Sequence, residues 1–234
     1  MKKTILNYLL IAIFAIVAVS CNPDNDENGN ENVQLVKTIT LIDDVNGNSD
    51  WNFEYDNKNR ITSALGLGYL AIVYNGDNLV KLIYDDNILF FEKEGNNIIA
   101  TNEDGVVCYV INLNSDGYPI RFNLNGDGYV SYQYLDGNLE SIGNNGEIWN
   151  TFKYDNKKSP FYHCKTPKWF QICFLTWPMI GAGFAYGLVI KNNVTEFYDD
   201  DGIHSKIECT YEYNDNDFPT KMYWNSKLIA TFMF

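Results

Sequence analysis

The fold is decided by residues 210–222, which read Thr-Tyr-Glu-Tyr-Asn-Asp-Asn-Asp-Phe-Pro-Thr-Lys-Met. Aromatic residues alternate with polar ones up to a run of Asn and Asp residues, and an apolar residue follows the run. Alternation is typical of a half-buried strand, and Asn and Asp favour tight turns because they bond the local backbone and tolerate left-handed conformations. The stretch therefore predicts one β-hairpin.

Weaker copies of this pattern recur upstream at steps of about 20 residues. The aromatic or apolar residues next to the turns are Tyr55, Tyr74, Phe91, Leu113, Tyr134, Tyr154 and Tyr213. Two strands and two turns fit this period, and no helical run separates the copies before the last interval. We therefore expect an all-β fold, a curved antiparallel meander of hairpin repeats that forms an open or half-barrel sheet.

Most of the copies also place a second apolar residue two positions before the turn residue. The pairs are Phe53 with Tyr55, Ile72 with Tyr74, Ile111 with Leu113, Tyr132 with Tyr134, Phe152 with Tyr154, and Tyr211 with Tyr213. Successive side chains of a strand point to opposite faces, so each pair shares one face and the residue between them lies on the other. Those intervening residues are mostly polar, which predicts a sheet with one buried and one wet face.

Residues 161–190 interrupt the repeat with an apolar insert that carries no charge from Trp169 to Ile190. One reading is a transmembrane helix, because the run is long enough to span a bilayer. Pro178 and three glycines within the run favour a second reading. In this one a short helix starts near Thr166 and Pro167, with Thr166 as N-cap, turns at Pro178 and covers the concave face of the sheet.

The first 21 residues have the pattern of a targeting segment. Lys2 and Lys3 precede an apolar run over residues 5–19, and small residues lead into Cys21. An ordinary secretory signal or a short membrane helix is the alternative reading, although the run is short for a membrane span. Residues 22–32 contain no large apolar side chain, so they predict a disordered acidic tether, and residues 33–234 then form a single domain.

The residues around Cys21 resemble a bacterial lipoprotein signal with its lipobox. The resemblance implies cleavage before Cys21, lipid attachment to that cysteine and an outer-membrane location. The acidic run that follows is similar to the surface-export signal of Bacteroidetes lipoproteins, which implies exposure on the cell surface. The inner leaflet stays open as the alternative.

The hairpin turns and the insert together resemble a family of uncharacterised Bacteroidetes lipoproteins with a porin-like fold. The residues that carry this resemblance are the copy at 152–161, the insert, residues 191–195 and the copy at 211–220. More loosely, the turns are similar to the Tyr-Asp (YD) repeats of surface proteins. The family resemblance implies a strongly curved antiparallel sheet around an apolar insert, and it brings no known activity.

The charge of the chain limits its partners. The formal net charge is −13, and removal of Lys2 and Lys3 with the signal makes the mature chain two units more negative. Nucleic-acid binding needs clustered Lys and Arg, so polyanions are not expected as partners. The membrane, through the lipid anchor, is the expected contact.

The sequence predicts no metal site and no cofactor. His163 and His204 do not stand at a metal-ligand spacing, and His163 with Cys164 and Cys173 reads better as buried side chains of the insert than as ligands. Whether Cys164 and Cys173 form a disulfide is left open. The turn carboxylates are explained by bonds to their own backbone, and no phosphate loop or nucleophile motif occurs, so an enzyme is not expected.

One pattern points to a ligand. Tyr69, Tyr129 and Trp149 stand at the same place in three copies, on the predicted wet face, where aromatic rings can stack on a polysaccharide. We therefore interpret the chain as a surface-anchored, non-enzymatic binding or structural lipoprotein, with glycan as the first ligand to test. A glycoside-cleaving enzyme and a surface scaffold or adhesin are the alternatives.

Overall fold

The computed structural model describes residues 32–43, 47–66, 68–124, 128–175, 188–199 and 205–234 of the chain. Residues Gln34–Phe234 form one compact unit. The predicted signal peptide, Cys21 and nearly all of the predicted tether lie outside the described residues.

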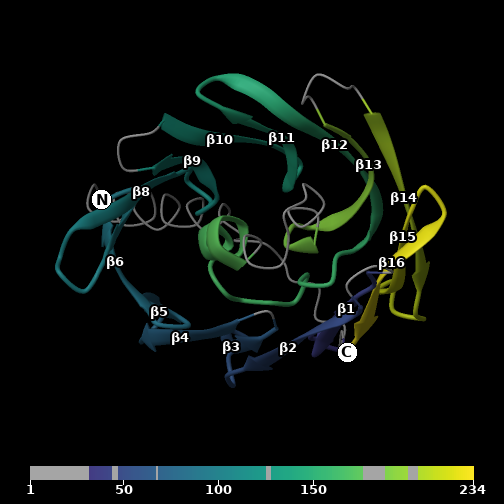
Figure 1. Ribbon diagram of the computed structural model, residues 1–234, viewed down its shortest axis with the longest axis horizontal. Helices are drawn as coiled ribbons and strands as arrows, with labels where there is room; N and C mark the ends of the chain where they lie inside the picture. The colour runs from purple at the N-terminus through teal and green to yellow at the C-terminus, as the bar shows by residue number, and fades with distance from the viewer. Residues whose placement is uncertain (1–31, 44–46, 67, 125–127, 176–187, 200–204) are drawn as a thin grey trace, which may run out of the picture. The chain divides into compact units, whose positions relative to one another are not determined.

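The described strands form a closed antiparallel barrel (Figure 1). In chain order they are β1 (Thr38–Leu41), β2 (Ser49–Tyr55), β3 (Ile61–Leu65), β4 (Tyr69–Asn75), β5 (Asn78–Tyr84), β6 (Asn87–Glu94), β7 (Asn97–Thr101), β8 (Val107–Leu113), β9 (Pro119–Leu124), β10 (Gly128–Leu135), β11 (Asn138–Asn144), β12 (Glu147–Lys158), β13 (Asn192–Asp199), β14 (Ser205–Tyr213), β15 (Pro219–Trp224) and β16 (Lys227–Met233).

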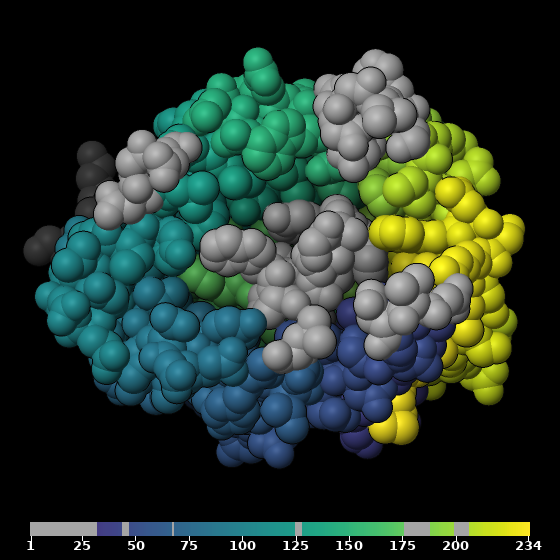
Figure 2. Space-filling view, viewed as in Figure 1, coloured from purple at the N-terminus to yellow at the C-terminus, as the bar shows by residue number. Residues whose placement is uncertain are grey.

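Each strand pairs with the next, and β1 pairs with β16, with Thr38 opposite Met233 and Leu41 opposite Ala230. The antiparallel meander is therefore confirmed, but the predicted open or half-barrel sheet is wrong, because the first and last strands meet. Closure pairs the backbone groups that two free edges would leave exposed, and a local repeat does not reveal whether the edges meet. Figure 2 shows the ring of strands in the same view, with green side chains visible inside it.

The repeat is confirmed as one strand pair in six of its seven copies. The predicted hairpin at 152–161 is wrong, because β12 continues to Lys158 and pairs with β13, which follows the insert. The confirmed copies include a feature that the sequence pattern did not predict. In five hairpins the turn residue is followed by a bulge that places one extra residue in the return strand. The extra residues are Thr62, Val80, Ile120, Glu140 and Thr220. A bulge bends the strand and increases its twist, so its repetition supplies curvature that a closed barrel needs.

The predicted buried face lines the inside of the barrel. Phe53, Ile72 and Phe152 are buried there, and the turn tyrosines are partly buried against the same core. Their hydroxyl groups have a role that the apolar pattern did not predict. Tyr74 donates to the carbonyl of Ile61 at 3.0 Å and Tyr154 to that of Leu139 at 2.6 Å.

Tyr134 makes the same kind of bond, to the carbonyl of Pro119 at 2.7 Å. In each of these three cases the acceptor lies opposite the turn residue of the preceding hairpin. Burial raises the pKa of Tyr74 to about 12, so its hydroxyl is protonated and donates at neutral pH. The tyrosines therefore join successive hairpins as well as filling the core.

The described part of the apolar insert packs inside the barrel, and it contains the helix α2 (Lys168–Phe170) followed by one π-helical turn, η1 (Gln171–Leu175). The Phe174 ring lies 5.3 Å from that of Phe91 on β6 and 5.8 Å from that of Phe122 on β9, measured between centroids. The described part of the insert therefore packs against the inner face of the wall. The prediction placed it on the concave face of an open sheet, and that face is the inside of the closed barrel.

The predicted N-cap is wrong. Pro167 occupies the N-cap position and its side chain makes no capping bond. The Thr166 hydroxyl instead accepts a hydrogen bond from the backbone N–H of Ile61 at 2.7 Å and so attaches the insert to the barrel wall. The predicted turn at Pro178 and much of the apolar run lie outside the described residues. No helix in the described part of the chain is long and apolar enough to span a membrane.

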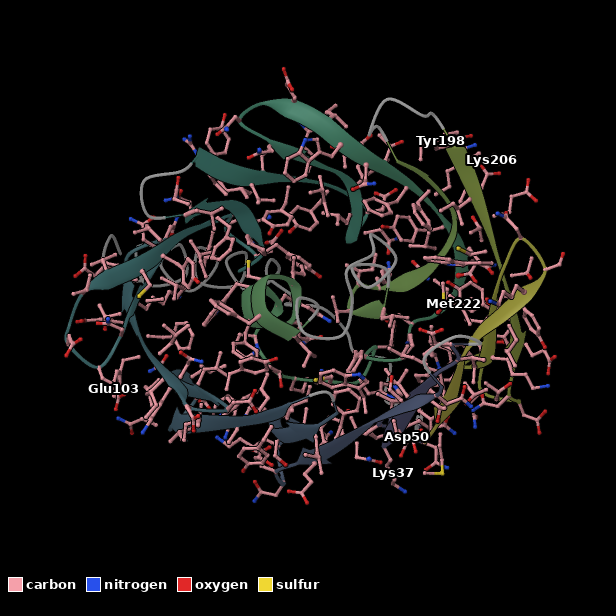
Figure 3. The ribbon with its side chains drawn as sticks, in the orientation of Figure 1. Lys37, Asp50, Glu103, Tyr198, Lys206 and Met222 are labelled. Atoms are coloured by element: carbon pink, nitrogen blue, oxygen red, sulfur yellow. The ribbon has the colours of Figure 1, made fainter. Side chains whose placement is uncertain are left out.

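The outward side chains divide the barrel wall into two sides. Over β12–β15 they are mainly charged, and we call Lys153, Glu196, Lys206, Glu208, Glu212 and Lys221 the charged outer face. Figure 3 shows Lys206 and Tyr198 on the outside of this wall. Over β3–β8 they are mainly apolar, and we call Leu65, Tyr69, Ala71, Val73, Ile83, Ile88, Phe90, Ile99, Val107 and Val110 the apolar outer face.

Candidate binding cavity

A cavity of about 720 Å³ opens at one end of the barrel, between the insert and the wall formed by β4–β8. This end carries the connections opposite to the Tyr-Asp turns. Its described lining residues are Leu70, Leu82, Tyr84, Asp86, Asn87, Ile88, Leu89, Asn102, Glu103, Asp104, Cys108, Tyr109 and Phe174. The volume is within the range of small-molecule sites.

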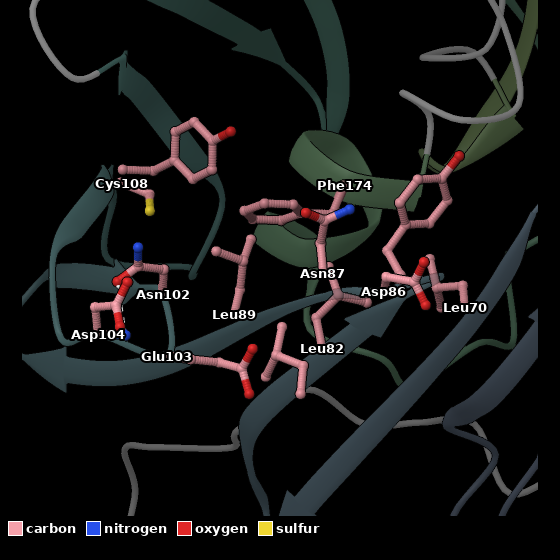
Figure 4. Close-up of a pocket in the computed structure, with 13 residues that line it drawn as sticks. Leu70, Leu82, Asp86, Asn87, Leu89, Asn102, Glu103, Asp104, Cys108 and Phe174 are labelled. Atoms are coloured by element: carbon pink, nitrogen blue, oxygen red, sulfur yellow. Dashed lines mark hydrogen bonds between the residues drawn. The ribbon is translucent and has the colours of Figure 1, made fainter.

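The floor of the cavity is apolar. Leu82 and Leu89 come from the neighbouring strands β5 and β6, and Phe174 comes from the insert (Figure 4). The Tyr109 ring lies 6.1 Å from that of Phe174, at an interplanar angle of 70°. An apolar floor of this kind favours a ligand with an apolar body, because burying it removes hydrocarbon surface from water.

The rim of the cavity is polar and acidic. Asp86 lies in the turn between β5 and β6, and Glu103 and Asp104 lie in the loop between β7 and β8. Asn102 holds this loop, since its side-chain oxygen accepts hydrogen bonds from the backbone N–H of Asp104 at 3.1 Å and of Val106 at 2.9 Å. The rim carboxylates therefore stand on an ordered loop at the mouth of an apolar space.

The chemistry of the lining suits binding. None of its described residues is His, Lys or Arg, so the three carboxylates have no basic partner in the lining. Nor do the described residues contain a cluster of three or more His, Cys, Asp or Glu side chains suited to hold a metal ion. The carboxylates offer negative charge and hydrogen-bond acceptors to a ligand whose part at the rim is neutral or cationic.

The three aromatic residues singled out from the sequence do not line this cavity. Tyr69 on β4 and Trp149 on β12 are exposed, by 48% and 41%, while Tyr129 on β10 is half-buried. Tyr69 on β4 and Tyr129 on β10 lie six strands apart, with five strands between them. The closed barrel therefore does not place the three rings in one row.

Tyr129 and Trp149 remain two strands apart, but the local geometry of each differs from the expected one. Trp149 is itself the extra residue of a bulge, since Ile142 pairs with Asn150 and Gly143 with Ile148. The guanidinium carbon of Arg121 lies 3.4 Å from the centroid of the Tyr129 ring, so one face of that ring is already covered. A flat stacking surface for a sugar is therefore less developed here than the sequence pattern suggested.

The residues of the insert with ligand-like side chains are part of the packing. His163 Nδ1 accepts a hydrogen bond from the backbone N–H of Gln34 at 2.9 Å, and its ring packs on Phe218. Cys164 and Cys173 are buried and both thiols are free, so the disulfide that the sequence left open is not formed. Burial raises the pKa of both thiols, which disfavours the reactive thiolate.

A second cavity of about 520 Å³ lies at the opposite end of the barrel, and its lining is mostly polar. It includes Asp155, whose carboxylate accepts hydrogen bonds from Tyr213 and from the backbone N–H of Asn193 and Lys157. Asp155 lies within β12 and not in the predicted turn, and it joins β12 to β13 and β14. Its carboxylate also bonds the local backbone at Lys157, as predicted for the turn carboxylates, so it supports the fold.

Comparison with known proteins gives distant likenesses to solved structures. No family model and no curated protein matches the sequence. A porin-like protein from Bacteroides uniformis shares 15% identity over 84% of this chain and 95% of its own, with a TM-score of 0.40. A porin-like protein from Bacteroides vulgatus shares 10% identity over 86% of this chain and 99% of its own, with a TM-score of 0.39.

Both proteins are described as porin-like. The family that the sequence resembles, with its lipoprotein and YD-repeat features, stays a prediction. At TM-scores below 0.5 the function of this chain has to be argued from its own geometry.

The cavity was missed from the sequence because its parts are far apart in the chain. Leu82, Leu89 and Tyr109 follow the ordinary inward pattern, and Phe174 lies in the insert, so nothing local marks them as a site. One signal was available. The acidic turns Asp85–Asp86 and Glu103–Asp104 both belong to the connections that a meander places at one end of the sheet.

Proposed function

We propose that this chain is a lipid-anchored, non-enzymatic barrel protein that binds a small ligand with an apolar body in the cavity at the end of β4–β8. The single observation that carries the proposal is a cavity of about 720 Å³ with an apolar floor and an acidic rim, beside a described core of apolar and aromatic side chains. The rim charges favour a neutral or cationic ligand over an anionic one.

The anchor is the part of this proposal taken from the sequence. Residues 1–21 resemble a lipoprotein signal, and the charged outer face favours a barrel wall exposed to water over β12–β15. A Cys21→Ala variant should no longer label with palmitate, since no other residue of the chain stands at a lipobox. Continued labelling would contradict the anchor and leave the cavity unaffected.

The cavity is tested by a neutral apolar fluorophore, N-phenyl-1-naphthylamine, titrated into the protein from Gln34 to Phe234. We expect saturable binding that a Leu89→Trp substitution weakens about tenfold, because the larger ring occupies the floor. Loss of ~1.4 kcal/mol corresponds to this factor. The matched control is Leu228→Trp, at a half-buried leucine on β16 outside the cavity.

Two outcomes would contradict the binding proposal. One is fluorophore binding that Leu89→Trp and Leu228→Trp affect equally, and the other is no saturable binding to the wild type. The charge of the rim is checked by replacing the neutral probe with an anionic naphthalene sulfonate, which should bind more weakly. Glu103→Gln combined with Asp104→Asn should reduce that difference.

Glycan binding at Tyr129 and Trp149 is the second candidate, favoured by the exposure of the Trp149 ring. Trp149→Ala should then weaken retention on polysaccharide while the melting temperature stays nearly unchanged, because an exposed ring contributes little to the core. Release of reducing ends by the wild type would instead support a glycoside-cleaving enzyme, and no retention with no cleavage would leave the scaffold role.

A further inference from the structure

We propose that the apolar outer face of the barrel rests on the lipid surface to which the chain is anchored. The inference relies on the lipid anchor of the proposed function but not on the cavity. It would give the barrel a fixed orientation on the membrane, with β3–β8 toward lipid and β12–β15 toward water.

The strand register makes the apolar outer face continuous. Leu65 pairs with Tyr69 at the edge of the face, and a first row crosses β3–β6 from Ser63 through Ala71 and Ile83 to Ile88. A second row crosses the wall from Val73 through Lys81, Phe90 and Thr101 to Val107.

A third row follows on β6–β8, from Glu92 through Ile99 to Val110. The outward side chains of six neighbouring strands thus form one surface, in which Lys81 and Glu92 are the only charged members of these three rows.

This surface is accessible in the barrel. Leu65, Val73 and Phe90 are exposed by 56%, 42% and 41%. None of them is needed for the core, because the inward residues of the same strands, such as Leu70, Ile72 and Phe91, are the buried ones. A contiguous exposed apolar patch of this kind usually marks a surface that contacts a protein partner or a membrane.

The shape and composition favour lipid over a second copy of the chain. The outer side of a closed barrel is convex, and two convex walls touch along a narrow strip, whereas a stable protein interface buries roughly 800 Å² on each partner. A lipid headgroup layer deforms around a convex wall. Lys81 also lies over the Phe90 ring, with its Nζ 5.4 Å from the centroid, and a ring beside a long cationic side chain is typical of membrane-interface positions.

The chain that precedes the barrel fits this occupant. Residues 22–33 separate the predicted lipidated cysteine from Gln34, and a chain of that length reaches about 40 Å when extended. An anchor this close keeps the barrel at a local concentration in the millimolar range, so even a shallow contact is populated. The apolar outer face therefore does not need the affinity that an unanchored protein would need.

The test reproduces the anchor without relying on Cys21. The chain from residue 22 onward carries an N-terminal His-tag and is bound to vesicles of phosphatidylethanolamine and phosphatidylglycerol that contain a nickel-chelating lipid. Phe90→Trp places a reporter on the apolar outer face, and Tyr198→Trp places the matched reporter on the outside of β13 beside the charged outer face. Brominated acyl chains quench tryptophan that reaches the hydrocarbon boundary.

We expect brominated vesicles to lower the fluorescence contributed by Trp at position 90 about twofold, after subtraction of the parent protein, and to leave that at position 198 unchanged. Adding Val73→Asp to the Phe90→Trp protein should abolish the quenching, and its unchanged melting curve would show that the barrel remains folded.

Equal quenching at both positions, or none at position 90 while flotation shows the protein bound, would overturn the proposal. So would a dimer in vesicle-free buffer that Phe90→Glu converts to monomer, because the face would then belong to a second copy. Failure of palmitate labelling at Cys21 would contradict the anchor of the proposed function without changing this result.

Discussion

The charged outer face and the apolar outer face belong to the same barrel and stand on the same inner wall. Over β12–β15, Lys206 bonds both Glu196 at 3.0 Å and Glu208 at 2.8 Å, and Lys221 bonds Glu212 at 2.9 Å. Over β3–β8, most of the corresponding outward positions hold Val, Ile, Leu, Phe and Tyr. Both sides use the same hairpin repeat, with inward aromatic residues and bulged return strands.

The difference shows that the repeat fixes the inner side of each strand and leaves the outer side free to follow its surroundings. An inner residue must fill the space beside the insert, whereas an outer residue contributes little to folding wherever it meets water or lipid. We therefore expect the residue types at the outward positions to match the medium that each side of the wall contacts. The following predictions separate the two contributions.

The largest effect on stability is expected from the inner tyrosines, which pack inside the barrel behind both the charged and the apolar outer face. Tyr213→Ala should lower the free energy of unfolding by about 3–5 kcal/mol, because it removes a partly buried ring that packs on Tyr211 and a bond to Asp155. Tyr74→Ala, behind the apolar outer face, should be similarly costly. The outward control Tyr223→Ala should change the free energy by no more than about 0.5 kcal/mol.

Urea unfolding of the three variants measures these differences. A Tyr213→Ala protein with unchanged stability would contradict the assignment of the inner face. A large loss for Tyr74→Ala with none for Tyr213→Ala would show that the two sides of the barrel do not share one core.

A smaller effect on stability is expected from the apolar outer face itself. Leu65→Ser combined with Val73→Thr should leave the free energy of unfolding within about 1 kcal/mol of the wild type, because both side chains are exposed. The same double variant should reduce the brominated-lipid quenching of a Trp at position 90. A double variant that is severely destabilised but still shows full quenching would contradict this prediction. These side chains would then stabilise the fold and would not contact lipid.

The smallest effect is expected on the charged outer face and depends on pH. Hydrogen bonds from Lys153 and Lys206 hold the pKa of the Glu196 carboxyl at about 2. The folded pKa is below the unfolded value of about 4.3, so the stabilisation is present above about pH 4.3 and is lost as the pH falls through about 2.

Glu196→Gln should therefore melt slightly below the wild type at neutral pH and at the same temperature near pH 2. Lys153→Met removes one of the two lysines that bond Glu196. It should also melt below the wild type at neutral pH, with a smaller difference near pH 2. A difference from the wild type that is as large at pH 2 as at pH 7 would show that the ion pairs do not cause it.

The sequence predicted the strands and the inner face because both depend on local alternation. Phe53, Ile72 and Phe152 were placed on the inside correctly. Tyr55, Leu113 and Tyr213 end their strands as predicted, whereas Tyr154 lies inside β12. The closure of β1 on β16 was not predicted, because the pairing of Thr38 with Met233 joins the two ends of the barrel domain. No local pattern encodes such a contact.

The candidate site was less predictable than the fold. Thr166 was read as a helix cap from its place before Pro167, yet its hydroxyl bonds the wall at Ile61 because the insert enters a closed barrel. Tyr69 and Tyr129 share a position in the repeat, but a ring of strands sets them six strands apart. The cavity depends on where Phe174 of the insert packs against β6 and β8, which follows from packing in three dimensions.

The central claim is that the barrel folds in water around its own apolar insert, and the protein from Gln34 to Phe234 tests it most directly. Expressed without signal and tether and kept in detergent-free buffer, it should remain in solution, show a strand-dominated far-UV circular dichroism spectrum and melt in one cooperative transition. A protein that aggregates in buffer and acquires the same spectrum only in detergent micelles would contradict the account.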